Sequence, residues 1–370
     1  MKDFQYFTII ASLFVLSCCK NNVSDYEINW EQYPVENISA PTIFQINGNE
    51  ILSDSKLCLI GDSALFIKSL RLQSGEIHLY KIEGDTLRWN NEIIRKGNGP
   101  LDGGNNNSEI NTFEDGSIVI GVEGYEPKVF VLSPDKKSFI NNLNQWERDN
   151  ISLNSLFVQE ILLSNKERFI LQLAGDVPSI LATYELGDTT ISWIPFPYPD
   201  DKYNDFSRTM MYYGTMNKRP QNNQYIYKMA KGRYIFTFSL NENNQMENIN
   251  YLFNIPPKFK LLEDGIGSVD EDDNLIRSEV YCTQNYIYVA YNDITYLDLL
   301  TGKDTAKNDG YKSWFFKKIH VFDWNGTPIK TLLFDRYISN FVINEDDSYL
   351  YGNILDLETD ETSIVRYQLN

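Results

Sequence analysis

The stretch His320-Val321-Phe322-Asp323-Trp324-Asn325-Gly326-Thr327-Pro328-Ile329-Lys330 has the pattern of a β-hairpin. Apolar and polar residues alternate in the segments around Asn325-Gly326, and a period of two is typical of half-buried strands. Asn-Gly is a strong turn signal, because glycine adopts positive φ at no steric cost. We therefore predict two antiparallel strands joined at Asn325-Gly326.

Two short apolar runs separated by a turn recur along the whole chain. Six such units start about 50 to 65 residues apart, and long amphipathic helices are lacking. The first runs of the units are Ala64–Ile67, Ser117–Ile120, Arg168–Leu171, Arg233–Phe236, Asn285–Tyr288 and Ser348–Tyr351. The second runs are Ile77–Tyr80, Lys128–Val131, Ile180–Tyr184, Asn250–Phe253, Ile319–Phe322 and Ile364–Tyr367.

This repeat predicts an all-β fold, a six-bladed β-propeller. Each unit has room for about four short strands, and stacking such units around an axis buries both faces of every sheet. A pair of β-sandwiches and a β-helix are the alternatives. The last unit supplies three strands, near residues 338–343, 349–353 and 363–368. We expect its fourth from the N-terminal side, from Thr42–Ile46 or Leu57–Ile60, so that this pairing closes the ring.

The first residues have the parts of a bacterial export signal: a short charged start, an apolar run at Phe4–Leu16 and a small residue before a cysteine. The apolar run is too short to cross a bilayer, which takes about 20 residues. Val15-Leu16-Ser17-Cys18 resembles a lipobox, in which the cysteine is lipidated. Each buried methylene of the acyl chains contributes about 0.8 kcal/mol of membrane affinity. Cleavage before Cys19 and an ordinary cleaved signal are the alternatives.

These features divide the chain into a lipoprotein signal peptide at 1–17, a polar tether at 18–37 and a propeller domain at 38–370. They place the protein in the bacterial cell envelope, with Cys18 as the lipidated residue and the membrane as a partner through the lipid. We expect the outer membrane, and the leaflet is left open.

The composition excludes some functions. The net charge is −18, with 51 acidic and 33 basic residues. So acidic a surface repels phosphate backbones, and we predict no nucleic-acid partner. The two histidines, His78 and His320, lie in separate apolar segments, which argues against a zinc site or a Ser-His-Asp triad. The acidic run Asp270–Asn274 lacks EF-hand spacing. We predict no metal, no cofactor and no identifiable catalytic residue.

Two cysteines lie outside the leader, Cys58 and Cys282. They either pair in an oxidising compartment or are small buried residues.

The segment Pro195–Gln224 is the candidate binding site. It is long, shows little strand pattern and is rich in aromatic residues, and a loop of this length in a compact domain is often functional. Aromatic faces with interleaved polar groups suit a sugar ring or a peptide. The alternative is a loop that packs its own aromatic residues against the rim of a blade. The candidate ligand-binding residues are Tyr198, Tyr203, Arg208, Tyr212 and Tyr213.

Two motifs resemble a known family. Ile94–Pro100 resembles the Gly-x-Gly-Pro-Gly-Glu-Phe signature of six-bladed propeller lipoproteins from Bacteroides-type gut bacteria, although Leu101–Gly104 replaces its Gly-Glu-Phe. The hairpin His320–Lys330 resembles the (I/V)-x-V-F-D-W-x-G-x-P hairpin of the TolB-like members. The resemblance covers roughly residues 40–370. It implies a six-bladed fold on an exported lipoprotein, implies no settled activity and transfers no functional residue.

The leading functional hypothesis is a membrane-anchored propeller that binds without catalysis. Its ligand would be a glycan, a peptide or a neighbouring envelope protein. The alternative is a glycan-active hydrolase or lyase that uses carboxylates at the mouth of the propeller channel, since the fold alone does not decide function.

Overall fold

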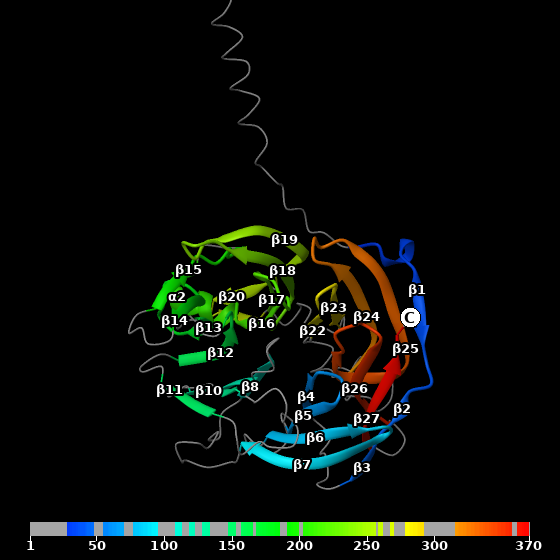
Figure 1. Ribbon diagram of the computed structural model, residues 1–370. Coiled ribbons are helices and arrows are strands. Elements are labelled where there is room, and N and C mark those ends of the chain that lie inside the picture. The colour runs from blue at the N-terminus through cyan, green and yellow to red at the C-terminus, as the bar shows by residue number, and fades with distance from the viewer. Residues whose placement is uncertain are drawn as a thin grey trace, which may run out of the picture.

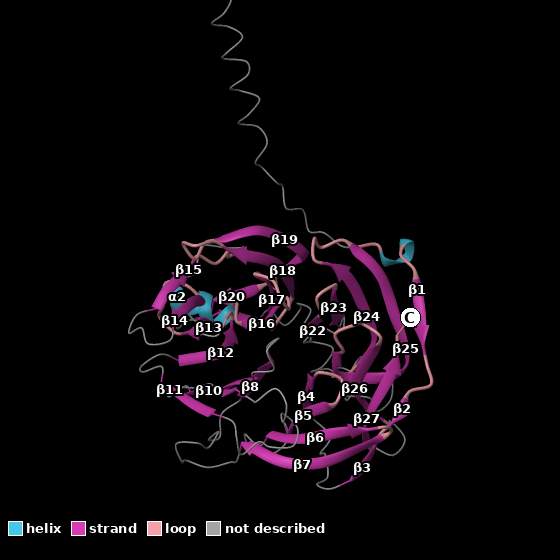
Figure 2. Cartoon of the chain, in the orientation of Figure 1, coloured by secondary structure: helices cyan, strands magenta, loops and turns pink. Residues whose placement is uncertain are grey.

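The sheets surround a central axis, as in a β-propeller, and almost every described element is a strand (Figures 1 and 2). The all-β propeller prediction is confirmed. This computed structural model describes residues 28–47, 55–69, 77–94, 108–112, 118–122, 128–133, 147–152, 157–165, 168–185, 191–199, 203–256, 258–261, 267–269, 278–291, 315–356 and 361–369.

Each blade is an antiparallel meander with its first strand nearest the axis (Figure 1). Blade 1 is β4 (Ser55–Ile60), β5 (Ala64–Ser69), β6 (Ile77–Glu83) and β7 (Thr86–Ile94). Blade 2 is β8 (Ser108–Thr112), β9 (Ile118–Val122), β10 (Lys128–Ser133) and β11 (Glu147–Ser152). Blade 3 is β12 (Phe157–Leu163), β13 (Arg168–Ala174), β14 (Leu181–Glu185) and β15 (Ile191–Ile194). Blade 4 is β16 (Gly214–Lys218), β17 (Gln224–Met229), β18 (Arg233–Leu240) and β19 (Met246–Ile255).

Blades 5 and 6 form one continuous sheet, because they share a long strand. Blade 5 is β22 (Ser278–Cys282), β23 (Tyr286–Tyr291), β24 (Phe316–Asp323) and the first part of β25 (Pro328–Ile343). Blade 6 is the last part of β25, β26 (Tyr349–Leu355) and β27 (Thr362–Gln368). The two ends of β25 pair with β24 and β26, at Ile319↔Leu332 and Val342↔Tyr351. A small hairpin, β20 (Phe259–Leu261) and β21 (Gly267–Val269), follows blade 4.

The hairpin predicted at Asn325-Gly326 joins β24 to β25. Gly326 has a φ of 82°, and its backbone N–H donates to the Asp323 carbonyl at 3.0 Å. The Asp323 carboxylate also accepts the backbone N–H groups of Asn325 and Thr327, at 2.9 and 2.8 Å. The turn is therefore held by the local hydrogen bonds that Asx residues favour.

The N-terminal belt, residues 28–47, runs along the outer edges of three blades. It consists of η1 (Trp30–Gln32), β1 (Val35–Ile38), β2 (Thr42–Ile43) and β3 (Gln45–Asn47). β1 is parallel to β25 in blade 5, β2 is antiparallel to β27 in blade 6, and β3 is parallel to β7 in blade 1. The expected pairing of an N-terminal strand with the last blade is seen at Thr42↔Arg366. Residues 28–37, which the sequence places in the tether, lie against blade 5 instead.

Middle strands are buried as continuous runs. β13 is buried from Phe169 to Ala174, and β18 from Tyr234 to Phe238. Neighbouring blades cover both faces of such strands, so apolar residues do not have to alternate with polar ones. Within the described residues, no helix has the length and apolar composition to span a membrane.

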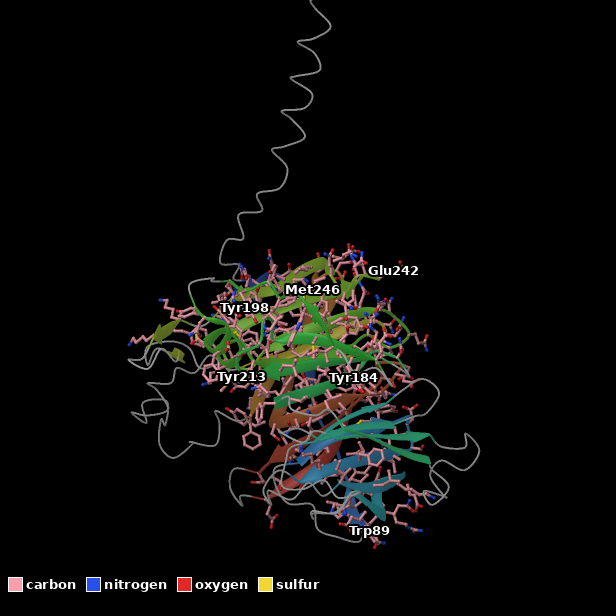
Figure 3. All side chains as sticks on the ribbon, turned by 90° about the vertical axis from the view of Figure 1, so that its left-hand side faces the viewer. Trp89, Tyr184, Tyr198, Tyr213, Glu242 and Met246 are labelled. Atoms are coloured by element: carbon pink, nitrogen blue, oxygen red, sulfur yellow. The ribbon has the colours of Figure 1, made fainter. Side chains whose placement is uncertain are left out.

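The two faces of the disc differ in their connections. On one face lie the connections that follow the outermost strand of a blade, such as 195–213 between β15 and β16. On the other face lie the connections between the third and the outermost strands, such as 324–327 between β24 and β25. Viewed edge-on, Tyr198 and Tyr213 lie toward one side of the disc, and Tyr184 and Glu242 toward the other (Figure 3). We name these sides the long-connection face and the short-turn face.

Candidate binding face

The connection between blades 3 and 4 contains the one α-helix of the described residues, α2 (Asp205–Met211). Asn204 caps it: its backbone is extended, and its side-chain oxygen accepts the Ser207 N–H at 2.8 Å. Such a cap satisfies a backbone donor that has no partner within the helix. A short helix therefore forms where the sequence analysis expected a loop.

Helix α2 is fixed to the turn between β13 and β14. The Thr209 hydroxyl donates to the Gly175 carbonyl at 2.6 Å and accepts the Gly175 N–H at 3.2 Å. Gly175 has a φ of 118°, which a residue with a Cβ rarely adopts. The same hydroxyl lies 3.0 Å from the Phe206 carbonyl, one turn back along the helix. These bonds set the rotation of α2, so that Ser207, Thr209 and Met211 are buried.

The predicted site residues gather at this place, but with different exposure. Tyr203 and Tyr212 are buried in the core between blades 3 and 4, and Tyr198 and Tyr213 pack against that core while half-buried. The Tyr203 hydroxyl donates to the Phe259 carbonyl at 3.3 Å. The Tyr212 ring meets those of Tyr198 and Phe259 edge-on, each at 5.5 Å. The buried pair therefore holds the segment in place.

Tyr198 and Arg208 form the polar part of this cluster. The Tyr198 hydroxyl accepts the Ile180 N–H at 3.0 Å, and burial raises the pKa of Tyr198 to about 12. The Arg208 guanidinium lies 4.9 Å from the centroid of the Tyr198 ring and forms an ion pair with Asp205. Cation–π contacts of this kind contribute about 0.5–2 kcal/mol, depending on exposure. Arg208 is thus held between a ring and a carboxylate, and it is half-buried.

The chemistry-bearing residues elsewhere are separate from one another. His78 lies in β6 and accepts the Trp89 indole N–H at 3.4 Å, whereas His320 is buried in β24. Cys58 and Cys282 are both free thiols, so the two do not pair. The described ranges contain no group of three His, Cys, Asp or Glu residues that could hold a metal ion. Cys18, Gly97–Pro100 and Asp270–Asn274 lie outside the described residues.

Sequence reasoning missed α2 and the two parallel strands of the belt, β1 and β3, although it expected the pairing that β2 makes with the last blade. The signal for α2 was the Asn204 cap followed by Asp205 in the first turn, a pattern that favours helix starts. The belt gave no comparable signal, because its strands contain only two to four residues each.

Several solved structures align with most of the chain. A member of the DUF4221 family from Bacteroides vulgatus aligns with a TM-score of 0.56 at 10% identity, covering 90% of this chain and 97% of that one. The β-propeller domain of Cps50 (Swd1) from Myceliophteria thermophila aligns with a TM-score of 0.48 at 9% identity, covering 90% and 100%. An α-L-arabinanase from Penicillium chrysogenum, complexed with arabinobiose, has a TM-score of 0.44 at 9% identity, covering 89% and 97%.

No curated protein matches the chain in sequence. The model of the TolB-like 6-blade propeller-like family matches residues 131–346, which is more than half of the chain and includes the hairpin at Asn325-Gly326. The resemblance inferred from that hairpin is thereby confirmed, and the chain belongs to the TolB-like six-bladed propeller family.

Proposed function

We propose that the chain is an envelope lipoprotein whose propeller binds a partner on its long-connection face without catalysing a reaction. The observation that carries this proposal is the segment 195–213. It projects a capped helix, an arginine stacked on a tyrosine and exposed apolar side chains from one face of a rigid scaffold. Binding residues are disproportionately found on loops that a rigid scaffold positions.

The anchor in this proposal is Cys18. Ile28, the first described residue, lies ten positions after it and is buried between blades 4 and 5. Ten extended residues span at most about 35 Å. A lipid on Cys18 would therefore keep the propeller close to the envelope membrane. In a producing bacterium, we expect Cys18→Ala to abolish labelling with a clickable fatty acid, and unchanged labelling would refute the anchor.

Ring closure by the belt belongs to the same proposal. In it, β2 is the fourth strand of blade 6, and Phe44 continues the contact through its N–H to the Ile364 carbonyl at 3.0 Å. The Arg366 guanidinium lies 5.6 Å from the Phe44 ring centroid and 3.4 Å from the carboxylate of Asp85 in the β6–β7 turn. These contacts join the last blade, the belt and the first blade.

Half-buried Tyr198, Arg208 and Tyr213 would contact the ligand, which is a glycan, a peptide or an envelope protein. Tyr203 and Tyr212 would act indirectly, since their rings are buried. The test is a combined glycan and peptide array probed with the full chain in detergent. We expect Arg208→Gln to abolish the binding signal and the matched variant Arg88→Gln, at an exposed arginine of β7, to retain it. Equal binding by both variants would contradict the proposal.

A further inference from the structure

Exposed apolar side chains lie on α2 and at the start of β12, the inner strand of blade 3. Three of the large apolar side chains exposed in the described chain are found there: Phe157, Phe206 and Met210, with 36, 38 and 41% of their surfaces exposed. Of the other five, Val35, Ile43 and Ile46 lie along the belt, Trp89 in blade 1 and Ile329 in blade 5. We call the set of three the α2 patch. Isolated exposed apolar residues need no explanation, but a group of them marks an interaction site.

Backbone contacts link α2 to the inner strands of blade 3. Phe157 opens β12 and is paired with Ala174 of β13. The next residue, Gly175, is hydrogen-bonded through both backbone groups to Thr209 of α2. Phe206 and Met210 are four residues apart and share the solvent face of the helix. The α2 patch therefore combines one residue of the inner strand β12 with two residues of α2, the helix that is bonded to the turn after β13.

We propose that the α2 patch docks a protein segment that carries an apolar side chain flanked by lysine or arginine. This inference rests on the proposed function, and it names the class of partner. Aromatic residues and methionine are enriched at the cores of protein interfaces, and the flexible thioether of methionine adapts to the shape of a partner. The side chains of the patch carry no hydroxyl, amide or charged group, so they offer a sugar none of the hydrogen bonds that its hydroxyls form.

The charge of the chain selects a basic partner. Asp176 is exposed and directly follows Gly175, which is hydrogen-bonded to α2. Asp205 is ion-paired with Arg208, so this carboxylate is compensated within the chain. The whole chain carries a net charge of −18. A second copy would add its own negative charge to this surface and be repelled, whereas a cationic segment would be attracted.

The experiment uses random 12-residue peptides displayed on phage, selected on the full chain in detergent. We expect the enriched peptides to carry an aromatic or aliphatic residue next to lysine or arginine. A synthetic version should lose about tenfold or more of its affinity for Phe206→Ala/Met210→Ala, as expected for an interface hot spot. Asp176→Asn should weaken binding at low salt, with a smaller effect at high salt, because salt screens exposed charges.

Matched controls separate the patch from general effects. Ile43→Ala/Ile329→Ala removes two exposed apolar side chains elsewhere, and Glu242→Gln removes an exposed acid from the short-turn face. Both variants should bind the synthetic peptide with an affinity within about twofold of that of the parent chain. Met210→Lys keeps a strong helix former in α2 and should also abolish binding. Unchanged thermal melting of these variants will show that their folds are intact.

The inference is overturned if no peptide is enriched, if enriched peptides lack basic residues, or if they bind the patch variants as well as the parent. A glycan on the array that depends on Arg208 but not on the α2 patch would overturn this inference and leave the proposed function standing. If neither a peptide nor a glycan binds, this inference fails, and the proposed function is left with an envelope protein as its ligand.

Discussion

The indole ring of Trp30 stacks on the imidazole of His320, with ring centroids 3.8 Å apart and planes inclined by 24°. The Tyr291 ring stacks on the same imidazole at 5.1 Å. His320 is 5% exposed, and its Nδ1 lies 3.0 Å from the Thr331 hydroxyl. A belt residue is therefore bound to the middle of blade 5 through a buried histidine, which makes the attachment of the belt sensitive to acid.

Burial, aided by Lys318, lowers the pKa of His320 to about 3. Above pH 6.5 the imidazole is neutral in both folded and unfolded chains. As the pH falls below 6.5, the unfolded chain binds a proton that the folded chain excludes, so stability falls toward pH 3. At pH 4.5, two units below the ordinary pKa of histidine, this loss of folding stability amounts to about 2.7 kcal/mol. Cation–π attraction to Trp30 would offset about 0.5–2 kcal/mol of this.

The measurement is urea unfolding of the parent and of His320→Phe at pH 7.5 and 4.5. The variant keeps an aromatic ring but cannot titrate. We expect the parent to lose roughly 1–2 kcal/mol more than the variant between the two pH values. Equal losses would show that His320 does not account for the acid sensitivity.

Gly214, the first residue of β16, has no room for a side chain. A Cβ there would lie 2.0 Å from the Lys228 carbonyl oxygen and 2.9 Å from the Met229 Cα. Both are backbone atoms, so neither can rotate away. We expect Gly214→Ala to destabilise the chain by about 3 kcal/mol or more. Gly84→Ala is the control: it meets nothing within 4 Å and has only a positive φ of 63° to accommodate, at a cost of about 1 kcal/mol. Equal urea unfolding midpoints for the two variants would contradict this account.

The aromatic residues of 195–213 should divide into structural and exposed ones. Tyr212 is 2% exposed, and its carbonyl accepts the hydroxyl of the fully buried Tyr227. We expect Tyr212→Ala to cost about 3–5 kcal/mol. Phe206→Ala, on the solvent face of α2, should change stability by at most about 0.5 kcal/mol. Thermal and urea unfolding will distinguish the two, and a large loss for Phe206→Ala would mean that its side chain is needed for folding.

The two free thiols should react at different rates. Cys58 is half-buried, whereas Cys282 is buried and its Sγ donates to the Lys218 carbonyl at 3.3 Å. Burial raises the pKa of Cys282 to about 12, which leaves almost no thiolate at neutral pH. Alkylation followed by peptide mass spectrometry should show Cys58 modified in the native chain and Cys282 only after unfolding. Early modification of Cys282 would contradict its burial.

Local patterns were enough to find most of the propeller. Turn chemistry at Asn325-Gly326 and recurring apolar runs each depend on neighbours in sequence, which a reader of the chain can see. Blade 4 shows where this fails. Its first strand, β16, lies inside the segment Pro195–Gln224, which the sequence analysis expected to be a loop. Met216 is the only large apolar residue of β16, so no apolar run marks it as a strand.

The belt and the α2 patch depend on contacts that no local pattern records. β2 has two residues, and its partner strand lies at the other end of the chain. Tyr212 and Phe206 are both aromatic residues of one segment, yet one is buried and the other exposed. The rotation of α2 decides between them, and the bonds between Thr209 and Gly175 set that rotation. The sequence therefore located the candidate segment but did not show which of its residues reach the solvent.

Site-specific photo-crosslinking tests the central claim most directly, that partners bind the long-connection face. A benzoylphenylalanine placed at the exposed Phe206 of α2 samples that face. One placed at Glu242 samples the short-turn face (Figure 3). In irradiated cells that produce the chain, the account predicts a discrete crosslinked adduct from position 206 and none from position 242. An adduct from position 242 with none from position 206 would contradict it.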